Sequence, residues 1–280
     1  MIVKFAKMHG IGNDYVYVNC LQHPLENPEG LAQIWSHRHT GIGSDGLVLI
    51  LPSVVADFCM RMFNADGSEA EMCGNASRCV GKYLYDFGLT EEREITLETK
   101  AGIKTLFLSV DSTGKVHRVT VDMGEPILNT ALIPVDLPHD QIIDQQVFIK
   151  DEAYDITCVS MGNPHAVIFT TGIDNIDLAK QGSDIEHSPL FPNRTNVEFV
   201  EIKSRQSMRM RVWERGAGET MACGTGACAA LVSAVLNDLS DRKAVVSLLG
   251  GDLEVEWRKP NNHVYLTGDA TLVYLGEIII

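Results

Sequence analysis

Short runs of apolar residues, some of them alternating with polar residues, recur along the whole chain and are typical of β-strands. We expect strands over residues 15–18, 58–63, 94–99 and 103–110 in the first half, and over residues 165–169, 208–213, 244–249 and 253–257 in the second. A last strand, residues 271–280, follows the second group. The pattern therefore predicts two successive groups of strands and one additional strand.

Two segments depart from the strand pattern and predict helices. Between Cys73 and Phe87 the apolar side chains recur at helical spacing, and Gly88 suits the end of a helix because glycine adopts the left-handed conformation without strain. Residues 227–239 are small and apolar on nearly all sides, as in a helix that is buried all round. We expect many strands around one buried helix in each half.

A shared motif opens both helices and belongs to a longer internal repeat. Cys73-Gly74 and Cys223-Gly224 lie 150 residues apart, each after a loop rich in Gly, Asp or Glu. The same offset aligns residues 12–13, 47–49, 61–64, 69, 95 and 101–102 with residues of the second half. Ungapped agreement over several segments indicates a duplicated domain, since the repeat is far longer than a solenoid unit. We place the join near residues 123–138, where one glycine and three prolines cluster.

Length, composition and charge narrow the class of protein. With 280 residues, two domains of roughly 140 residues each are expected. The formal net charge of −14 argues against nucleic acid or an anionic membrane as the main partner. The first residues show no signal-peptide pattern and no run approaches about 18 apolar residues, so we expect a cytoplasmic protein without a membrane partner.

The seven cysteines are expected to be free thiols, since their number is odd and no CxxC pair is present. Their spacings do not suit a zinc site, so no metal is expected. Cys73 and Cys223 differ from the other five because each lies where a helix begins. The free N–H groups and the helix dipole at such a position lower the pKa of a thiol, so we expect both to be thiolates at neutral pH.

Polar residues near the two cysteines suggest a small charged ligand. The backbone N–H groups of Gly74-Asn75 and of Gly224-Thr225-Gly226 suit a carboxylate, and also the negative charge that develops when an α-proton leaves. Glu214-Arg215 suits an ammonium and a carboxylate, or else forms a surface ion pair. Four asparagines at strand–loop junctions are further candidates, either as ligands or as turn formers: Asn13, Asn64, Asn163 and Asn196. His165 either tunes the pKa of a neighbouring thiol or has a structural role.

The motifs that hold these residues resemble those of one family, the diaminopimelate epimerases. They are HGIGNDY at residues 9–15, MCGNASRC at 72–79, GNPH at 162–165, RTNVE at 194–198 and the stretch from Trp213 to Gly226. The resemblance runs from the first residues to Val273-Tyr274. The two cysteine motifs with their flanks, in this order, are highly specific.

The resemblance implies an isomerase without cofactor or metal that interconverts LL- and meso-2,6-diaminopimelate on the bacterial route to lysine and peptidoglycan. It implies an α/β (α+β) fold with two pseudo-symmetric domains, each a mixed β-sheet or barrel wrapped around a central helix, and an active site in the interdomain cleft. The final strand would return to the first domain, which gives an N-terminal domain of residues 1–123 plus 270–280 and a C-terminal domain of residues 124–269. Homodimers are usual, and Tyr274 matches the interface tyrosine.

The resemblance also implies residue roles. From LL to meso, Cys223 is the base and Cys73 the acid, and the roles swap in reverse. The carboxylate at the reacting centre is bound by Gly74, Asn75, Gly224 and Thr225. The distal centre is held by Asn64, Asn163, Asn196 and Arg215, while Asn13 and Glu214 lie near the ammonium groups, and His165 and Glu214 tune the thiols.

One position departs from the family pattern. Gly46 stands where many members carry a glutamine that contacts the substrate, and glycine cannot supply that side chain. A backbone group or a water molecule would have to take its place.

Four other functions remain open on the residues. The chain is compatible with a related two-cysteine proline or hydroxyproline racemase, although Arg215 and the asparagines favour a substrate with a second charged end. Cys73 and Cys223 disfavour a related isomerase that lacks the cysteine pair. A non-catalytic amino-acid-binding protein, or a redox sensor with a Cys73–Cys223 disulfide, would use the same fold. Exchange of a substrate α-proton with solvent separates the catalytic alternatives from the last two.

Overall fold

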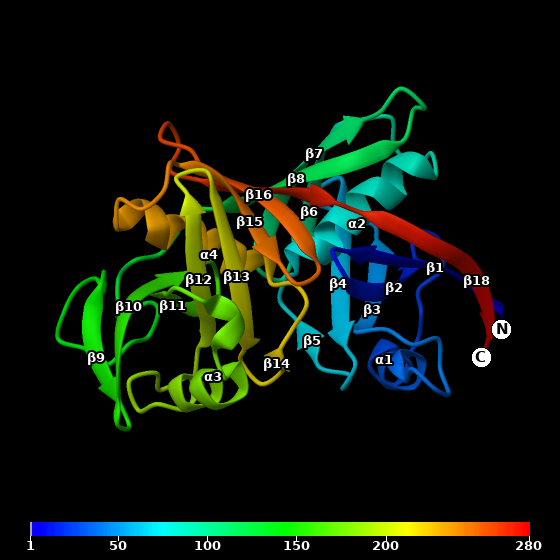
Figure 1. The fold of residues 1–280 in the computed structure, drawn as a ribbon. Helices are drawn as coiled ribbons and strands as arrows, with labels where there is room; N and C mark the ends of the chain where they lie inside the picture. Colours follow the sequence, from blue (N-terminus) through cyan, green and yellow to red (C-terminus); the bar gives the residue numbers. More distant parts are fainter. Residues whose placement is uncertain (1) are drawn as a thin grey trace. The chain divides into compact units, whose positions relative to one another are not determined.

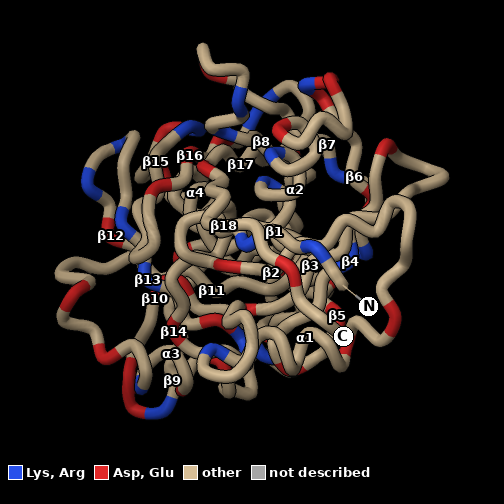
Figure 2. The backbone as a smooth tube through the Cα atoms, turned by 90° about the vertical axis from the view of Figure 1, so that its right-hand side faces the viewer, with Lys and Arg blue, Asp and Glu red and all other residues tan. Residues whose placement is uncertain are grey.

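The computed structural model describes residues 2–280, and the chain divides into two compact units. Unit 1 extends to Asp122 and resumes with Thr267–Ile280, whereas unit 2 is Met123–Leu266. Unit 2 thus begins at the first residue of the predicted join. Figure 1 shows the helices and strands, and Figure 2 shows acidic and basic residues interspersed along the backbone.

Unit 1 contains eleven strands and helices. They are β1 (Ile2–Gly10), β2 (Asn13–Asn19), α1 (Pro28–Ser36), β3 (Gly46–Leu51), β4 (Phe58–Asn64), β5 (Glu69–Ala70), α2 (Gly74–Asp86), β6 (Glu94–Thr99), β7 (Gly102–Val110), β8 (Val116–Gly124) and β18 (Thr271–Ile279). The strands pair in the order β18–β1–β2–β3–β4–β6–β7–β8, with β2–β3 and β4–β6 parallel and the other pairs antiparallel.

Helix α2 is the centre of unit 1. It contacts β1 and β2 near one end of the strand order and β7 near the other. Strands that are far apart in a sheet reach the same helix only if the sheet curves around it. Nine of the 13 residues of α2 are buried, so its side chains form part of the core.

Unit 2 repeats this arrangement with different residues. Its elements are β9 (Gln145–Ile149), β10 (Glu152–Ser160), β11 (Pro164–Phe169), the 3₁₀ turn η1 (Ile173–Asn175), α3 (Leu178–Glu186), β12 (Asn196–Ser204), β13 (Ser207–Glu214), β14 (Gly218–Glu219), α4 (Gly224–Leu236), β15 (Lys243–Leu248), β16 (Gly251–Trp257) and β17 (Val264–Asp269), which continues into unit 1. The pairing order is β9–β10–β11–β12–β13–β15–β16, with β11–β12 and β13–β15 parallel.

The duplication predicted from the sequence is confirmed in the fold. The elements β1 and β10, α1 and α3, and α2 and α4 each have bounds that differ by 150 residues, and the two parallel pairs occupy matching places in both units. The first strand of each repeat, β1 or β10, also pairs with a strand outside the repeat. This partner is β18 for β1 and β9 for β10.

Both predicted helices are present, with one shift. Cys73 and Phe87 cap α2, and Gly88 follows with φ of 69°, as expected for a helix end. Helix α4 begins and ends three residues earlier than predicted, because the carbonyl of Cys223 already accepts from Ala227 N at 3.0 Å. Ten of the 13 residues of α4 are buried, which confirms its predicted environment.

The short helices α1 and α3 were not predicted, although the sequence signals both starts. Asn27 caps α1 by accepting from Gly30 N, and proline follows directly at the first helical position. Asp177 caps α3 in the same way by accepting from Lys180 N. Trp35 of α1 is 2% exposed and joins the unit 1 core with Phe63. No helix within residues 2–280 is long and apolar enough to cross a membrane.

Candidate active site

Each of the two cysteines singled out by the repeat lies directly before the first residue of a buried helix. Cys73 is half-buried and has extended backbone, and its carbonyl accepts from Ser77 N at 2.9 Å. Cys223 is 5% exposed and is likewise extended at the start of α4. The first N–H groups of each helix, at Gly74 and at Gly224, have no partner within the helix.

In unit 1, three predicted residues come together. Asn13 is the first residue of β2, and its Oδ1 accepts from Cys73 Sγ at 3.4 Å and from Asn75 Nδ2 at 3.2 Å. The other side of the Asn13 amide, Nδ2, donates to Asp45 Oδ2 at 2.8 Å. Because Asp45 accepts from this nitrogen, the amide oxygen is held toward Cys73.

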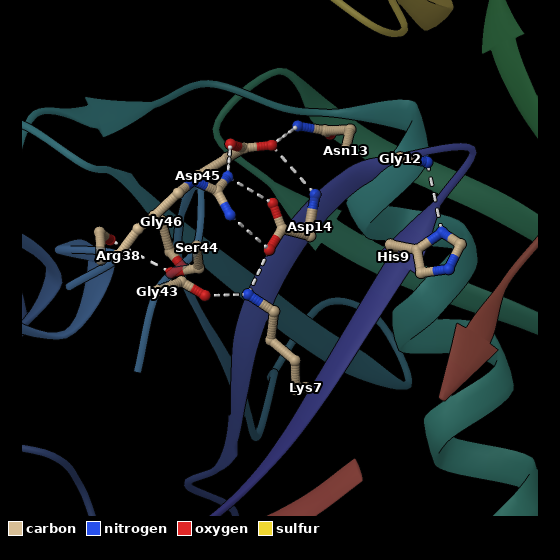
Figure 3. A network of polar contacts seen from close by, with 11 residues as sticks. Lys7, His9, Gly12, Asn13, Asp14, Arg38, Gly43, Ser44, Asp45 and Gly46 are labelled. Carbon is tan, nitrogen blue, oxygen red and sulfur yellow. Dashed lines mark hydrogen bonds and ion pairs between the residues drawn. The ribbon is translucent and has the colours of Figure 1, made fainter. Parts of the chain in front are cut away.

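A cluster of four charged residues lies behind Asn13 (Figure 3). Arg38 Nη2 donates to Asp14 Oδ1 at 2.8 Å and to Asp45 Oδ1 at 2.7 Å. Lys7 is 6% exposed, and its Nζ contacts Asp14 Oδ2 and the carbonyl of Gly43. Burial alone would raise the pKa of Asp14, but Arg38 and Lys7 hold that pKa below its ordinary value. The cluster is neutral as a whole and fixes the orientation of Asn13.

Asn75 connects this region to a buried arginine that the sequence reading did not single out. Asn75 is 2% exposed, and its Oδ1 accepts from Arg78 Nη2 at 2.9 Å. Arg78 is fully buried in α2, where its Nε donates to the carbonyl of Asp269 at 3.2 Å. Burial lowers the pKa of Arg78.

Gly46 and Asn64 lie opposite each other on β3 and β4. A Cβ at Gly46 would overlap the carbonyl oxygen of Phe63, so no side chain fits at this position without a shift of β4. In this chain the glycine is therefore required by strand packing. Asn64 Nδ2 donates to Ser68 Oγ at 3.0 Å within the turn that follows β4.

In unit 2, Cys223 lies among acidic and hydroxyl side chains. Gly226 N donates to Cys223 Sγ at 3.4 Å, and Thr225 Oγ1 lies 3.5 Å from the same sulfur. Glu214, at the end of β13, accepts from Cys223 and from the hydroxyl of Thr220. Burial raises the pKa of Glu214 above its ordinary value.

The prediction that Cys223 is a thiolate at neutral pH is wrong. Burial raises the pKa of Cys223 well above its ordinary value, and the carboxylates of Glu214 and Glu198 raise it further. Hydrogen bonds from Thr225 and from Gly226 N act in the opposite direction but are outweighed. A helix start lowers the pKa of a thiol, but at Cys223 the cost of burying the thiolate charge is larger and raises that pKa.

His165, Asn163 and Glu198 form a chain beside this cysteine. His165 Nδ1 lies 2.7 Å from Glu198 Oε1, with both side chains fully buried, and His165 Nε2 lies 3.0 Å from Asn163 Oδ1. The other carboxylate oxygen, Glu198 Oε2, has no hydrogen-bond partner. A Cβ at Gly226 would lie 2.7 Å from Glu198 Oε1 and 3.2 Å from Cys223 Sγ, so both groups meet at the first turn of α4.

Asn196 and Arg215 lie at neighbouring strand ends of the same unit. Asn196 Nδ2 donates to the carbonyl of Pro164 at 2.9 Å, and its Oδ1 accepts from Arg215 N at 2.9 Å. The guanidinium of Arg215 is exposed, and its Nη1 donates to the carbonyl of Asn193 at 3.1 Å. Its remaining donors are thus available to a carboxylate.

Comparison with known proteins agrees with these motifs. The family model "Diaminopimelate epimerase" matches residues 5–129 and 157–273. A diaminopimelate epimerase of Acetivibrio thermocellus is 59% identical over 276 residues, covering 99% of this chain and 98% of that protein. One of Methanococcus maripaludis is 56% identical over 278 residues, covering 99% and 100%.

The chain belongs to the diaminopimelate epimerase family. The resemblance stated from the motifs is thereby confirmed, and the family makes the chain an isomerase.

Solved structures with lower identity share the fold. A probable proline racemase from Agrobacterium radiobacter superposes with a TM-score of 0.74 at 17% identity, covering 99% of this chain and 93% of that chain. A phenazine biosynthesis protein of the PhzF family from Bacillus anthracis superposes with a TM-score of 0.71 at 18% identity, covering both chains fully. At this identity the two structures establish the shared fold only.

In this member of the diaminopimelate epimerase family, the predicted residues fall into two groups. Cys73, Asn13 and Asn75 meet in unit 1, and Cys223 meets Glu214 and Thr225 in unit 2. The residues that orient them were missed: Lys7, Asp14, Arg38, Asp45, Arg78 and Glu198. For Arg78 a signal existed, because it occupies a turn of the predicted helix between residues expected to be buried.

Replacing Asp14 with asparagine is expected to lower the free energy of unfolding by about 3 kcal/mol at pH 7, since the buried Lys7 ammonium loses its carboxylate. Because the pKa of Asp14 is lowered in the folded state, its stabilising effect is full above about pH 4 and disappears as the pH falls through the folded-state pKa. Urea denaturation should therefore show the difference between the two proteins shrinking in acid.

Glu277→Gln is the matched control, because it removes an exposed ion pair with Lys4 in the same unit. Its expected effect is within about 0.5 kcal/mol. Equal losses in the two variants would contradict a structural role for the cluster behind Asn13.

Proposed function

We propose that this chain interconverts LL- and meso-2,6-diaminopimelate by a two-base transfer of the α-proton, in the formation of lysine and peptidoglycan precursors. The observation that carries the proposal is the pair of cysteines at the starts of α2 and α4, in a chain of this family. The free cysteines suit a reducing compartment, so we place the reaction in the cytoplasm.

The proposed reaction needs one thiolate and one thiol. Cys223 removes the α-proton in the LL-to-meso direction while Cys73 delivers a proton to the opposite face, and the roles reverse for meso to LL. The two thiols therefore share one proton, and their apparent pKa values belong to the pair. The mechanism requires no electron sink, because positioning and fixed dipoles stabilise the developing negative charge.

The starts of both helices supply the groups for that charge. Backbone N–H groups at Gly74, Asn75, Gly224 and Thr225 have no partners within their helices and are suited to a carboxylate. We assign the carboxylate of the reacting centre to them. His165 and Glu214 act on the thiols, and the contact of Glu214 with Cys223 supports this role.

The distal amino-acid centre requires a second set of ligands. We assign it to Asn64, Asn163, Asn196 and Arg215, with Asn13 and Glu214 near the ammonium groups. The exposed guanidinium of Arg215 supports the assignment, because a planar pair of donors matches a carboxylate. Gly46 contributes no side chain, so any contact there comes from its backbone.

Cys73→Ser and Cys223→Ser are each expected to slow epimerisation by at least about 10²–10⁴-fold, since a serine hydroxyl is a far weaker base and acid here. The measurement is loss of the α-proton signal of meso-diaminopimelate in D2O, followed by NMR with the reduced protein. Cys59→Ser, at a half-buried cysteine of β4, is the control and should retain activity.

Near wild-type turnover in either active-site variant would refute the two-base assignment. Exchange with proline but not with diaminopimelate would identify a racemase of the related type. No exchange with either substrate would indicate a binding protein.

Arg215→Ala is expected to raise KM about 10–100-fold with a smaller change in kcat, since it removes a charged contact to the distal carboxylate. Steady-state kinetics in both directions measure the effect. Arg205→Ala is the matched control, because Arg205 is an exposed arginine of the same unit that pairs with Asp238 and Asp241. An unchanged KM for Arg215→Ala would exclude the distal-carboxylate role.

We further propose that the protein is a homodimer through β18. Three neighbouring apolar residues of this strand are exposed, Val273 by 53%, Tyr274 by 42% and Leu275 by 59%. The Tyr274 ring packs edge-on against Phe5, with centroids 6.0 Å apart, so its exposed face is held in place. Large exposed apolar side chains close together on one strand are typical of a protein interface.

Tyr274→Asp is expected to convert the dimer to a monomer, because it buries a charge in an apolar contact. Sedimentation equilibrium measures the mass. Phe148→Asp is the control, since Phe148 is 72% exposed on β9, which occupies in unit 2 the place of β18. A dimer that survives Tyr274→Asp but not Phe148→Asp would place the interface on β9 instead.

A further inference from the structure

Arg78 is a fully buried arginine without a carboxylate partner. Its Nη2 donates to Asn75 Oδ1 at 2.9 Å and its Nε to the carbonyl of Asp269 at 3.2 Å, while its Nη1 has no hydrogen-bond partner. The side-chain carboxylate of Asp269 is 71% exposed and lies 3.9 Å from Arg118 Nε. A buried charge of this kind is costly, so its presence at the first turns of α2 calls for a compensating negative group.

Cys73 is the ionisable group to which Arg78 is connected. Arg78 donates to Asn75, Asn75 Nδ2 donates to Asn13 Oδ1 at 3.2 Å, and Cys73 Sγ lies 3.4 Å from the same oxygen. The field of Arg78 acts on Cys73 and on the neighbouring Cys79.

The other groups around Cys73 do not balance this charge. Tyr17 and Cys79 are fully buried and neutral in their protonated forms, and burial raises the pKa of Cys79 to about 11. Behind Asn13, two basic and two acidic residues cancel: Lys7, Arg38, Asp14 and Asp45. The Asp269 carboxylate also acts on Arg78, but it is 71% exposed, so among the groups named here Arg78 is the least balanced charge.

One contact favours the protonated form of Cys73. Its sulfur faces the oxygen of Asn13, which is held there by Asp45. A thiol is a weak hydrogen-bond donor, and 3.4 Å is a long contact. A full charge on buried Arg78, together with the helix dipole at the start of α2, outweighs this bond.

Unit 2 carries the opposite charge at matching positions. With the offset of 150, Arg78 corresponds to Cys228, Val48 to Glu198 and Asn64 to Glu214. The same offset relates the strand registers, since Leu47 pairs with Phe63 and Val197 with Trp213. Unit 1, with Cys73, therefore has buried Arg78 where unit 2 has the neutral Cys228. Conversely, unit 2, with Cys223, has Glu198 and Glu214 where unit 1 has the neutral residues Val48 and Asn64.

Two acidic groups, a hydroxyl and a histidine lie around Cys223. Glu198 and Glu214 are acidic, Thr225 is a hydroxyl, and His165 is held by Glu198 at 2.7 Å. Glu198 Oε2 is buried without a partner, so this carboxylate is only partly compensated by His165.

We infer that Arg78 is a positioning residue that holds the negative charge of the thiol pair on Cys73, so that the substrate-free protein contains a Cys73 thiolate and a Cys223 thiol. The inference rests on the proposed function only in taking these two cysteines as the working pair. In the substrate-free protein Cys73 would then be the base that accepts the α-proton of the substrate. This is its role in the meso-to-LL direction of the proposed reaction.

The test measures the pH dependence of alkylation at each cysteine in the reduced, full-length protein. Iodoacetamide reacts with the thiolate, forming a C–S bond with loss of iodide, and peptide mass spectrometry separates the two sites at low conversion. The midpoint pH is compared rather than the rate, because Cys223 is less accessible than Cys73. We expect the Cys73 midpoint at least about one pH unit below that of Cys223. Equal midpoints, or a lower one at Cys223, would overturn the inference.

Variants of Arg78 test whether its charge is the cause. Arg78→Met should raise the Cys73 midpoint by about 1–2 pH units without raising that of Cys223, and Arg78→Lys should retain the wild-type value. Lys82→Met removes a positive charge from the same helix, where Lys82 pairs with Asp86, and should leave both midpoints in place. If Arg78→Lys behaves like Arg78→Met, or if neither moves the Cys73 midpoint, the charge of Arg78 is not the cause.

A second pair of variants covers the case in which Arg78→Met does not fold. Glu198→Gln and Glu214→Gln should each lower the Cys223 midpoint without lowering that of Cys73. If the Cys223 midpoint is unchanged in both variants, the two carboxylates do not hold Cys223 in its thiol form, and the inference is overturned. Because no substrate is needed, failure of this test is distinct from failure of the proposed reaction, which α-proton exchange measures.

Discussion

Burial of a helix start is the constraint on which the site depends. Helices α2 and α4 each lie within a curved sheet, so the first N–H groups of each helix are withdrawn from bulk water and still need acceptors. The sulfur of Cys223 meets part of this need by accepting from Gly226 N. Under the proposed function, a carboxylate of the substrate would accept from other N–H groups of these two helix starts.

The repeat made much of this predictable. The motifs around Cys73 and Cys223 located both helix starts, and the runs of apolar residues located nine of the 18 strands within residues 2–280, because both signals are local in sequence. The orienting residues were not predictable in the same way. Arg78 and Glu198 are charged residues in apolar surroundings, and only the fold shows that each is fully buried. The ionisation of Cys223 was mistaken for the same reason, since its burial outweighs the helix start.

The duplication gives two units with the same arrangement of strands and helices, but the charged groups around the two cysteines differ. Glycine at positions 74 and 224 and cysteine at 73 and 223 preserve the helix starts in both units. Around them, amide groups and one arginine surround the first cysteine, whereas carboxylates and a histidine surround the second. In the proposed reaction such a difference would place the single negative charge on one thiol, whereas two thiols in identical surroundings would share it equally.

The pairing of β18 with β1 has a consequence for how the chain is made. Ile2 lies opposite Ile279, so nearly the whole chain separates two strands of one sheet. On the ribosome, every strand of unit 2 is synthesised before β18, and the first strand of unit 1 waits for its partner until the last residues emerge. Until then the outer edge of β1 is open to other chains, and closing it requires an ordering step over a very long loop. Synthesis thus completes the second half of the molecule before the first.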